Sequence, residues 1–206
     1  MSRRYRNDEE ARAAFVLRFP NLADADFIIK SPWDDDYQCI AWAECYTDRK
    51  SWPGPGYAWP EGLPIADPPE TATKDHFIQR FSRLGYKPCG LDRSFEFGYQ
   101  KVAIYANDMG VTHMARQHIA GFGWLSKAGR MGDILHRNLE DIEGDMSVDA
   151  QKYGRVEIIL KRTLWSALVR LCLFRCFWAA FKFWLYRLVH SYNMRKWNMP
   201  VEGPTP

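Results

Sequence analysis

The chain lacks the cysteine patterns that mark metal sites and disulfide scaffolds. Its five cysteines form no C-x-x-C pair and have no cluster of histidines beside them. This spacing indicates neither a zinc site nor a disulfide framework. The glycine-containing stretches also lack the spacing of a phosphate-binding loop. The sequence therefore predicts reduced thiols, no metal and no cofactor. The cysteines are Cys39, Cys45, Cys89, Cys172 and Cys176.

Two further absences bear on location and partners. Residues 1–10 lack the apolar run of a secretion signal, so we expect a cytoplasmic chain. The formal net charge of +3 is too small to indicate a nucleic acid partner. Acidic residues are absent from positions 163–197, which contain several Arg and Lys, so nearly all acidity lies upstream.

What is present is enough apolar material for a packed core. Hydrophobic residues make up 47% and aromatic residues 15% of the 206 positions. We expect one domain over residues 1–162, followed by an apolar, basic helical extension with a disordered end over 163–206. Residues 51–69 are rich in proline and glycine and predict a long loop. Its tryptophans should pack onto the domain.

Helices are expected in the first half of the chain and strands in the second. The helices should cover about 8–19, ending before Pro20, then 37–46 with Asp36 as N-cap, and 71–84, ending at Gly85. Strands are expected over 102–106 and 111–115, with a turn at 107–110, and over 122–126 and 153–161. A short helix is expected over 132–139. This order predicts an α+β fold.

A cysteine and a histidine stand where a catalytic pair would stand. Cys39 opens the second predicted helix, whose N-terminal partial charge favours a thiolate. His113 lies on a later strand and is the best candidate for the general base. Asp133 could orient the imidazole if the chain turns back. The acidic run from Asp34 to Asp36 argues against a thiolate, because nearby carboxylates raise the pKa of a thiol.

Structural roles explain the same residues equally well. Cys39 lies beside Ile40 and Trp42 and fits a core position, because free cysteine is among the most buried residue types. His113 fits a hydrogen-bonded strand histidine. His76 and His118 compete as partners from less suitable elements, while His136 and His190 are expected at the surface.

Several blocks of the sequence resemble an uncharacterised, mainly bacterial domain family over about residues 19–162. The blocks are Cys39 to Ala43, Lys101 to Tyr105, Thr112 to Gln117 and Trp124 to Gly129. The pattern in turn distantly resembles papain-like and NlpC-type cysteine peptidases. This chain departs from it by having Gln38 where asparagine is common and by its long carboxy-terminal extension.

The resemblance implies a papain-like arrangement of a cysteine helix and a following antiparallel sheet. It implies that Cys39 and His113 are catalytic and that a substrate cleft is lined by Trp42, Gln117, Trp124, Ser126 and Lys127. The expected function is a cysteine hydrolase or acyl-transfer enzyme acting on amide bonds of a peptide, protein or glycopeptide. The alternative is a catalytically inactive binding module.

Residues 164–189 are long enough for a membrane span, but Arg170, Arg175 and Lys182 oppose one. Three interpretations stay open. The segment is a membrane-associated helix whose basic side chains reach the headgroups, or a helix that packs on the domain or a second copy. It could also be an extension with no selected structure.

Overall fold

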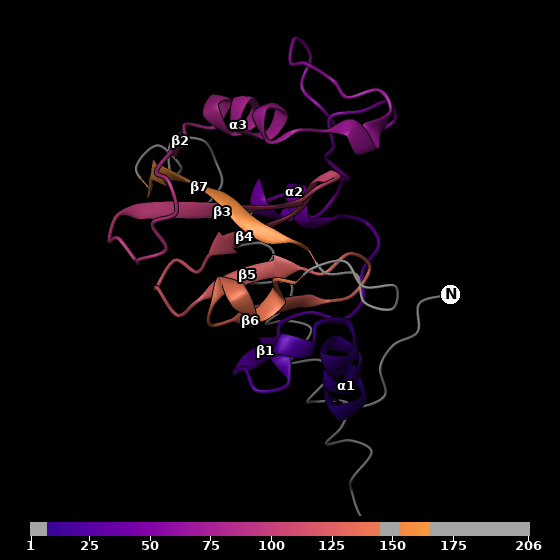
Figure 1. Cartoon of the computed structure of the whole chain (residues 1–206), viewed down its shortest axis with the longest axis vertical. Helices are drawn as coiled ribbons and strands as arrows, with labels where there is room; N and C mark the ends of the chain where they lie inside the picture. The colour runs from indigo at the N-terminus through magenta and orange to yellow at the C-terminus, as the bar shows by residue number, and fades with distance from the viewer. Residues whose placement is uncertain (1–7, 145–152, 165–206) are drawn as a thin grey trace, which may run out of the picture.

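A computed structural model describes residues 8–144 and 153–164. It contains a seven-stranded sheet with the order β1-β6-β5-β4-β3-β7-β2, and the neighbouring strands pair antiparallel. Figure 1 shows the sheet running from β2 near the top to β1 near the bottom, with α3 above it and α1 below. The predicted α+β class is confirmed.

The helices lie close to two of their three predicted ranges. They are α1 (Asp8–Arg18), α2 (Cys39–Ala43) and α3 (Lys74–Arg83), with short 3-10 turns η1 (Pro20–Leu22), η2 (Pro69–Thr71) and η3 (Leu139–Ile142). The α3 helix follows Thr73, whose backbone N–H donates to His76 Nδ1 at 3.2 Å. It ends before Gly85, which has the positive φ of +86° that glycine tolerates. The α2 helix is shorter than predicted.

The strands are β1 (Phe27–Ile29), β2 (Lys87–Pro88), β3 (Tyr99–Asn107), β4 (Gly110–Gln117), β5 (Trp124–Lys127), β6 (Asp133–His136) and β7 (Arg155–Thr163). The predicted hairpin and the strands near 122–126 and 153–161 are confirmed. The predicted helix over 132–139 is wrong. Ile134 pairs with Ser126 of β5 on one side and with Ile29 of β1 on the other. These distant partners impose an extended backbone that the local sequence does not reveal.

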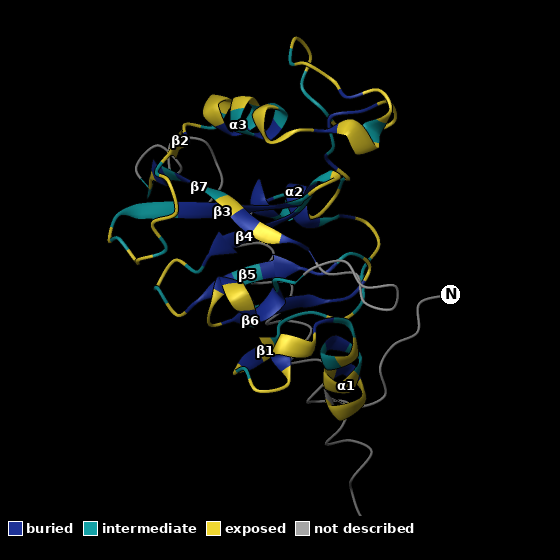
Figure 2. Cartoon of the chain, viewed as in Figure 1, coloured by how far each residue is buried: buried dark blue, intermediate teal, exposed yellow. Residues whose placement is uncertain are grey.

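The sheet separates two apolar layers, because successive strand residues point to opposite faces. The α1-side layer contains Phe15, Phe19, Tyr105, Ala115 and Ile159. The α2-side layer contains Ile40, Phe77, Ile104, Met114 and Leu160. Figure 2 shows the central strands mostly buried, while α1 and α3 expose their outer surfaces.

The proline-rich loop packs onto the domain as predicted. The rings of Trp52 and Trp59 lie edge-on to Phe77, with centroids 5.2 and 5.9 Å away. The predicted carboxy-terminal helix lies outside the described residues, apart from Leu164. No helix within 8–144 and 153–164 is long and apolar enough to cross a membrane.

Candidate functional site

Cys39 is the first residue of α2, which begins two residues after the predicted start at position 37, and Asp36 is not the cap. Gln38 is the N-cap, and its Oε1 accepts from the backbone N–H of Ala41 at 3.2 Å. The Gln38 amide also donates to the carbonyl of Ser51 at 2.6 Å, which ties α2 to the following loop. Asp36 instead donates its N–H to Asp34 Oδ1 at 2.8 Å. Gln38 therefore connects the start of α2 to the loop at Ser51. Asp36, the predicted cap, bonds only within its own turn through Asp34.

The Cys39 thiol lies in the α2-side core. The residue is 8% exposed and belongs to the same apolar cluster as Ile40 and Met114. Burial raises the pKa of the thiol to about 11, although a backbone hydrogen bond with Met114 and the charge of Lys127 partly oppose the shift. The main cause is burial rather than the acidic run before it. The thiol is therefore protonated at neutral pH.

His113 lies on the opposite face of the sheet. Its neighbour in β4, Met114, faces α2, so His113 faces α1. The imidazole is fully buried and stacks on Tyr153, with ring centroids 4.0 Å apart. Neither ring nitrogen has a hydrogen-bond partner among the described residues. Burial holds the pKa of His113 well below its usual value. The structure therefore does not bring the imidazole to the Cys39 sulfur.

Lys127 is on the Cys39 face and is fully buried. Its ammonium group donates to the carbonyls of Asp34 at 2.7 Å, Gly129 at 2.8 Å and Met131. It also lies 5.0 Å from the centroid of the Tyr37 ring. Burial lowers the pKa of Lys127, while the nearby carboxylates oppose that shift. The side chain thus holds the segment before α2 against the β5–β6 turn.

Asp133 is the cross-strand partner of Lys127. Its Oδ2 accepts from the Tyr37 hydroxyl at 2.7 Å, while Oδ1 is buried and has no partner within the described part of the chain. Burial raises the pKa of Asp133 to about 6, against the opposing hydrogen bond from Tyr37. The residue considered for orienting His113 therefore lies on the other face of the sheet.

Trp42 contacts a basic residue to which sequence reasoning assigned no role. The Arg116 guanidinium lies 4.7 Å from the Trp42 ring centroid and donates to the Trp42 carbonyl at 3.2 Å. It also donates to Cys45 Sγ at 2.6 Å. Arg116 follows Met114 by two positions in β4 and so shares its face. This period of two is the signal that could have identified it.

The remaining predicted substrate-binding residues face α1. Trp124 is buried in the α1-side core. Ser126 Oγ lies 2.8 Å from His136 Nε2, and Gln117 Nε2 donates to the carbonyls of Arg93 and Ser94 at 3.1 and 3.3 Å. The five residues proposed to line one cleft are therefore divided between two faces.

The prediction that His136 is at the surface is wrong. His136 is fully buried in β6, and its Nδ1 lies 2.7 Å from the Asn138 carbonyl. Because a carbonyl only accepts, Nδ1 carries the proton and Nε2 accepts from Ser126. Burial lowers the pKa of His136 to about 4, which keeps this tautomer neutral.

The polar side chains on the Cys39 face bond mainly to other groups of the protein. Lys127 and Arg116 donate to backbone carbonyls and to a thiol, and Tyr37 donates to Asp133. No group of histidine, cysteine and carboxylate side chains within the described ranges could hold a metal ion. These contacts join α2, the segment at Asp34 and the sheet.

Comparisons with known proteins identify a family without assigning an activity. No curated protein and no solved structure matches the chain. A family model described as a domain of unknown function (DUF7689) matches residues 28–161, which is more than half of the sequence. The chain therefore belongs to the DUF7689 family.

Proposed function

We propose that this chain is a catalytically inactive binding module. The observation that carries the proposal is the separation of Cys39 and His113 by the sheet. A cysteine nucleophile needs a thiolate and a base within hydrogen-bond reach. Here Cys39 is 8% exposed as a residue, the pKa of its thiol is raised to about 11, and the predicted base faces the other layer.

The groups around Cys39 also support a structural role. The Lys127 ammonium donates to three carbonyls, which leaves it no further proton to donate. Arg116 is 6% exposed and contacts Trp42 and Cys45. These donors hold the sheet, the Asp34 segment and α2 together rather than pointing at a reacting atom.

A cysteine hydrolase acting on amide bonds is the second candidate, and one observation favours it. Cys39 is the first residue of α2, where backbone N–H groups and the charge of Lys127 partly oppose the rise in the thiol pKa that burial causes. Its substrate would be a peptide, protein or glycopeptide. Reaction would require a rearrangement that exposes the Cys39 sulfur and brings it to His113, the base that the sequence predicts.

Site-resolved alkylation separates the two candidates. The full chain is treated with iodoacetamide from about pH 6 to about pH 9, and modification of each cysteine is followed by peptide mass spectrometry. Cys89, which is partly exposed, is the internal reference. If the chain is a binding module, we expect Cys39 to be alkylated more slowly than Cys89. The rate at Cys39 should be the same in wild type and in His113→Phe.

The opposite pattern would support the hydrolase. Selective modification of Cys39 below about pH 7, lost in His113→Phe, would indicate a thiolate paired with an imidazolium. The Cys39→Ala variant is the control for assignment of the modified peptide. If this variant also retains the wild-type unfolding curve, Cys39 can be replaced without loss of the fold.

A further inference from the structure

Both faces of β5 and β6 carry apolar side chains. On the α1 side, Trp124 and Ile134 are buried in the core. On the other side, Leu125 and Leu135 are only half-buried. An antiparallel strand with one face toward solvent ordinarily carries polar side chains on that face. The two leucines therefore indicate that a further element covers this part of the sheet.

The leucines belong to a row of apolar side chains that crosses three strands. Leu125 pairs with Leu135, and Leu135 pairs with Ile28 of β1, which is 53% exposed. From the other side, Arg116 of β4 pairs with Leu125 and contacts Trp42 of α2. Because cross-strand partners point to the same face, the row lies on the α2 side of the sheet. Ile28, Leu135 and Leu125 form the aliphatic row.

The core on the α2 side lies over the other half of the sheet. Its strand residues come from β3, β4 and β7, among them Met114 and Leu160. The core residues of β1 and β6, such as Phe27 and Ile134, lie on the α1 side instead. The aliphatic row thus lies outside the α2-side core. A sheet face with apolar side chains is completed by an element packed on it, most simply a helix.

Two aromatic rings border the row. The Trp42 ring lies 4.7 Å from the guanidinium of Arg116, the cross-strand partner of Leu125. His118 follows Arg116 by two positions and shares its face. The Phe122 ring, which is 72% exposed, packs on His118 with centroids 5.5 Å apart. The rings extend the apolar surface beyond the three aliphatic side chains.

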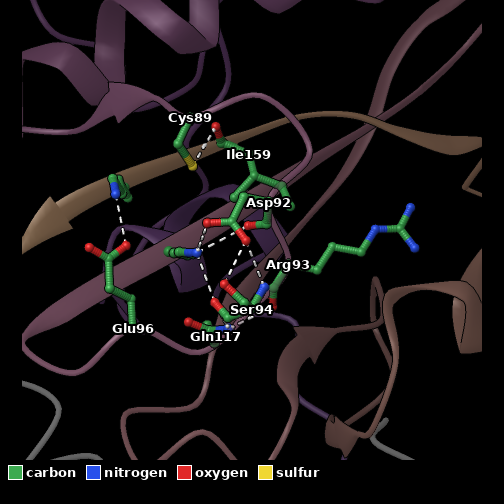
Figure 3. Close-up of polar contacts among 9 residues, drawn as sticks. Cys89, Asp92, Arg93, Ser94, Glu96, Gln117 and Ile159 are labelled. Carbon is green, nitrogen blue, oxygen red and sulfur yellow. Dashed lines mark hydrogen bonds and ion pairs between the residues drawn. The ribbon is translucent and has the colours of Figure 1, made fainter.

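The turn that carries Phe122 is supported by a neighbouring loop. A Cβ atom at Gly121 would lie 2.7 Å from the Phe95 ring, so this ring packs directly on the glycine backbone. Gln117, at the end of β4, donates to the Ser94 carbonyl at 3.3 Å. Figure 3 shows Gln117 beside Ser94, among the polar contacts of that loop. The Phe122 ring is therefore presented from a backbone with contacts on its other side.

Positive charge lies beside the aliphatic row. Lys30 follows Ile28 by two positions and is half-buried on the same face. Burial lowers the pKa of His118, and the charges of Lys30 and Arg116 lower it further, so both cations act on the imidazole. The ion pairs among the described residues do not include Lys30. Asp26, exposed just before β1, adds one carboxylate at the margin. A partner with carboxylates would therefore complement Lys30.

We propose that the aliphatic row binds an amphipathic α-helix of a partner protein, whose acidic side chains pair with Lys30. Three neighbouring strands span about 10 Å, which matches the diameter of one helix. The apolar face of such a helix packs on the row, and its flanking carboxylates reach the ammonium group. This inference rests on the proposed binding function and names its partner class.

Fluorescence anisotropy of a labelled peptide, titrated with the full chain, tests the proposal. The peptide has about 18 residues, with leucines at i, i+3, i+4 and i+7 and glutamates on both sides of that face. A scrambled peptide has the same composition but no apolar face, so it measures attraction to the basic residues within 163–197. We expect the ordered peptide to bind at least about tenfold more tightly than the scrambled one.

Substitutions separate the apolar contact from the charge. Ile28→Asp should weaken binding of the ordered peptide about tenfold. Leu17→Asp, which changes an α1 residue that is 80% exposed, should change it less than about twofold. Lys30→Glu should weaken the ordered peptide and strengthen a version with lysines in place of the glutamates. Lys87→Glu, at an exposed position of β2 on the far edge of the sheet, should do neither. Urea unfolding checks that each variant is folded.

Three results would overturn the proposal. Equal binding of the ordered and scrambled peptides would show that the chain recognises no apolar helix face. Unchanged affinity in both Ile28→Asp and Lys30→Glu would place the helix elsewhere. A dimer that becomes a monomer in Ile28→Asp by light scattering would mean that a second copy covers the row. Alkylation of Cys39 tests the absence of catalysis separately, because none of these peptides or substitutions alters Cys39.

Discussion

The imidazole of His113 stacks on the phenol ring of Tyr153, with centroids 4.0 Å apart and planes 9° from parallel. Tyr105 lies edge-on to the same imidazole at 5.4 Å. His113 therefore occupies its site as a flat aromatic ring. Its two nitrogens, which have no hydrogen-bond partner in the described structure, lose hydration without compensation.

Replacing His113 with phenylalanine should therefore preserve or increase stability. The substitution keeps a flat ring and removes two buried polar atoms, so we expect the free energy of unfolding to rise by up to about 1 kcal/mol at pH 7. Urea unfolding measures the change. In contrast, His76→Phe removes the acceptor for the Thr73 N–H and should cost about 0.5–1 kcal/mol. A loss above about 2 kcal/mol in His113→Phe would show that the imidazole nitrogens have an essential partner.

Two buried groups give opposite dependences of stability on pH. The pKa of His136 is lowered to about 4 in the folded state, so its contribution is complete above the unfolded pKa near 6.5 and is lost as the pH falls. The pKa of Asp133 is raised from 3.8 to about 6, so its contribution is complete below 3.8 and is lost as the pH rises. The two effects oppose each other between about pH 4 and about pH 6.

Replacing Asp133 with asparagine should leave the pH dependence of stability that comes from His136. Asparagine can still accept from the Tyr37 hydroxyl but does not titrate. We expect the free energy of unfolding of the variant, relative to wild type, to increase by up to about 3 kcal/mol from pH 4 to pH 6. Chemical unfolding at several pH values gives both curves. Parallel curves would mean that the Asp133 carboxyl has an ordinary pKa in the folded protein.

Replacing Lys127 with methionine removes the buried ammonium group and keeps a side chain of similar length. The variant leaves the carbonyls of Asp34, Gly129 and Met131 without their shared donor. Each buried carbonyl left unpaired is costly, so we expect a loss of about 2–4 kcal/mol. Lys50→Met, at an exposed position, should change stability by less than about 0.5 kcal/mol. Equal effects in a thermal unfolding experiment would remove the structural role assigned to Lys127.

Two glycines with similar backbone angles should respond differently to alanine. Gly98 and Gly154 have φ of +82° and +75°. A Cβ atom at Gly154 would lie 2.0 Å from the Ala106 carbonyl oxygen, whereas nothing lies within 4 Å of one at Gly98. Gly98→Ala should cost about 1–2 kcal/mol from backbone strain alone. Gly154→Ala should cost at least about 2 kcal/mol more, measured by urea unfolding, and equal costs would show that the backbone at Ala106 yields freely.

Helices and strands that depend on residues close together in the sequence could be predicted. The β3–β4 hairpin follows from two apolar runs separated by the turn at 107–110, and α3 follows from Phe77 and Phe81 at helical spacing before Gly85. The β6 strand could not be predicted in this way. Its backbone is held by β1 and β5, which pair with it from opposite sides.

The candidate site depends on the same distinction. The sequence alone determined that Cys39 opens a helix, that His113 stands on a strand, and that residues 51–69 form a loop with tryptophans packed beneath it. The tertiary structure decided that α2 crosses the face carrying Met114, which places Cys39 and His113 in different layers. Strand periodicity separates His113 from Met114 onto two faces, but it does not tell which face a distant helix will cover. Long-range packing makes that choice, because the helix buries its apolar side against whichever face offers the complementary surface.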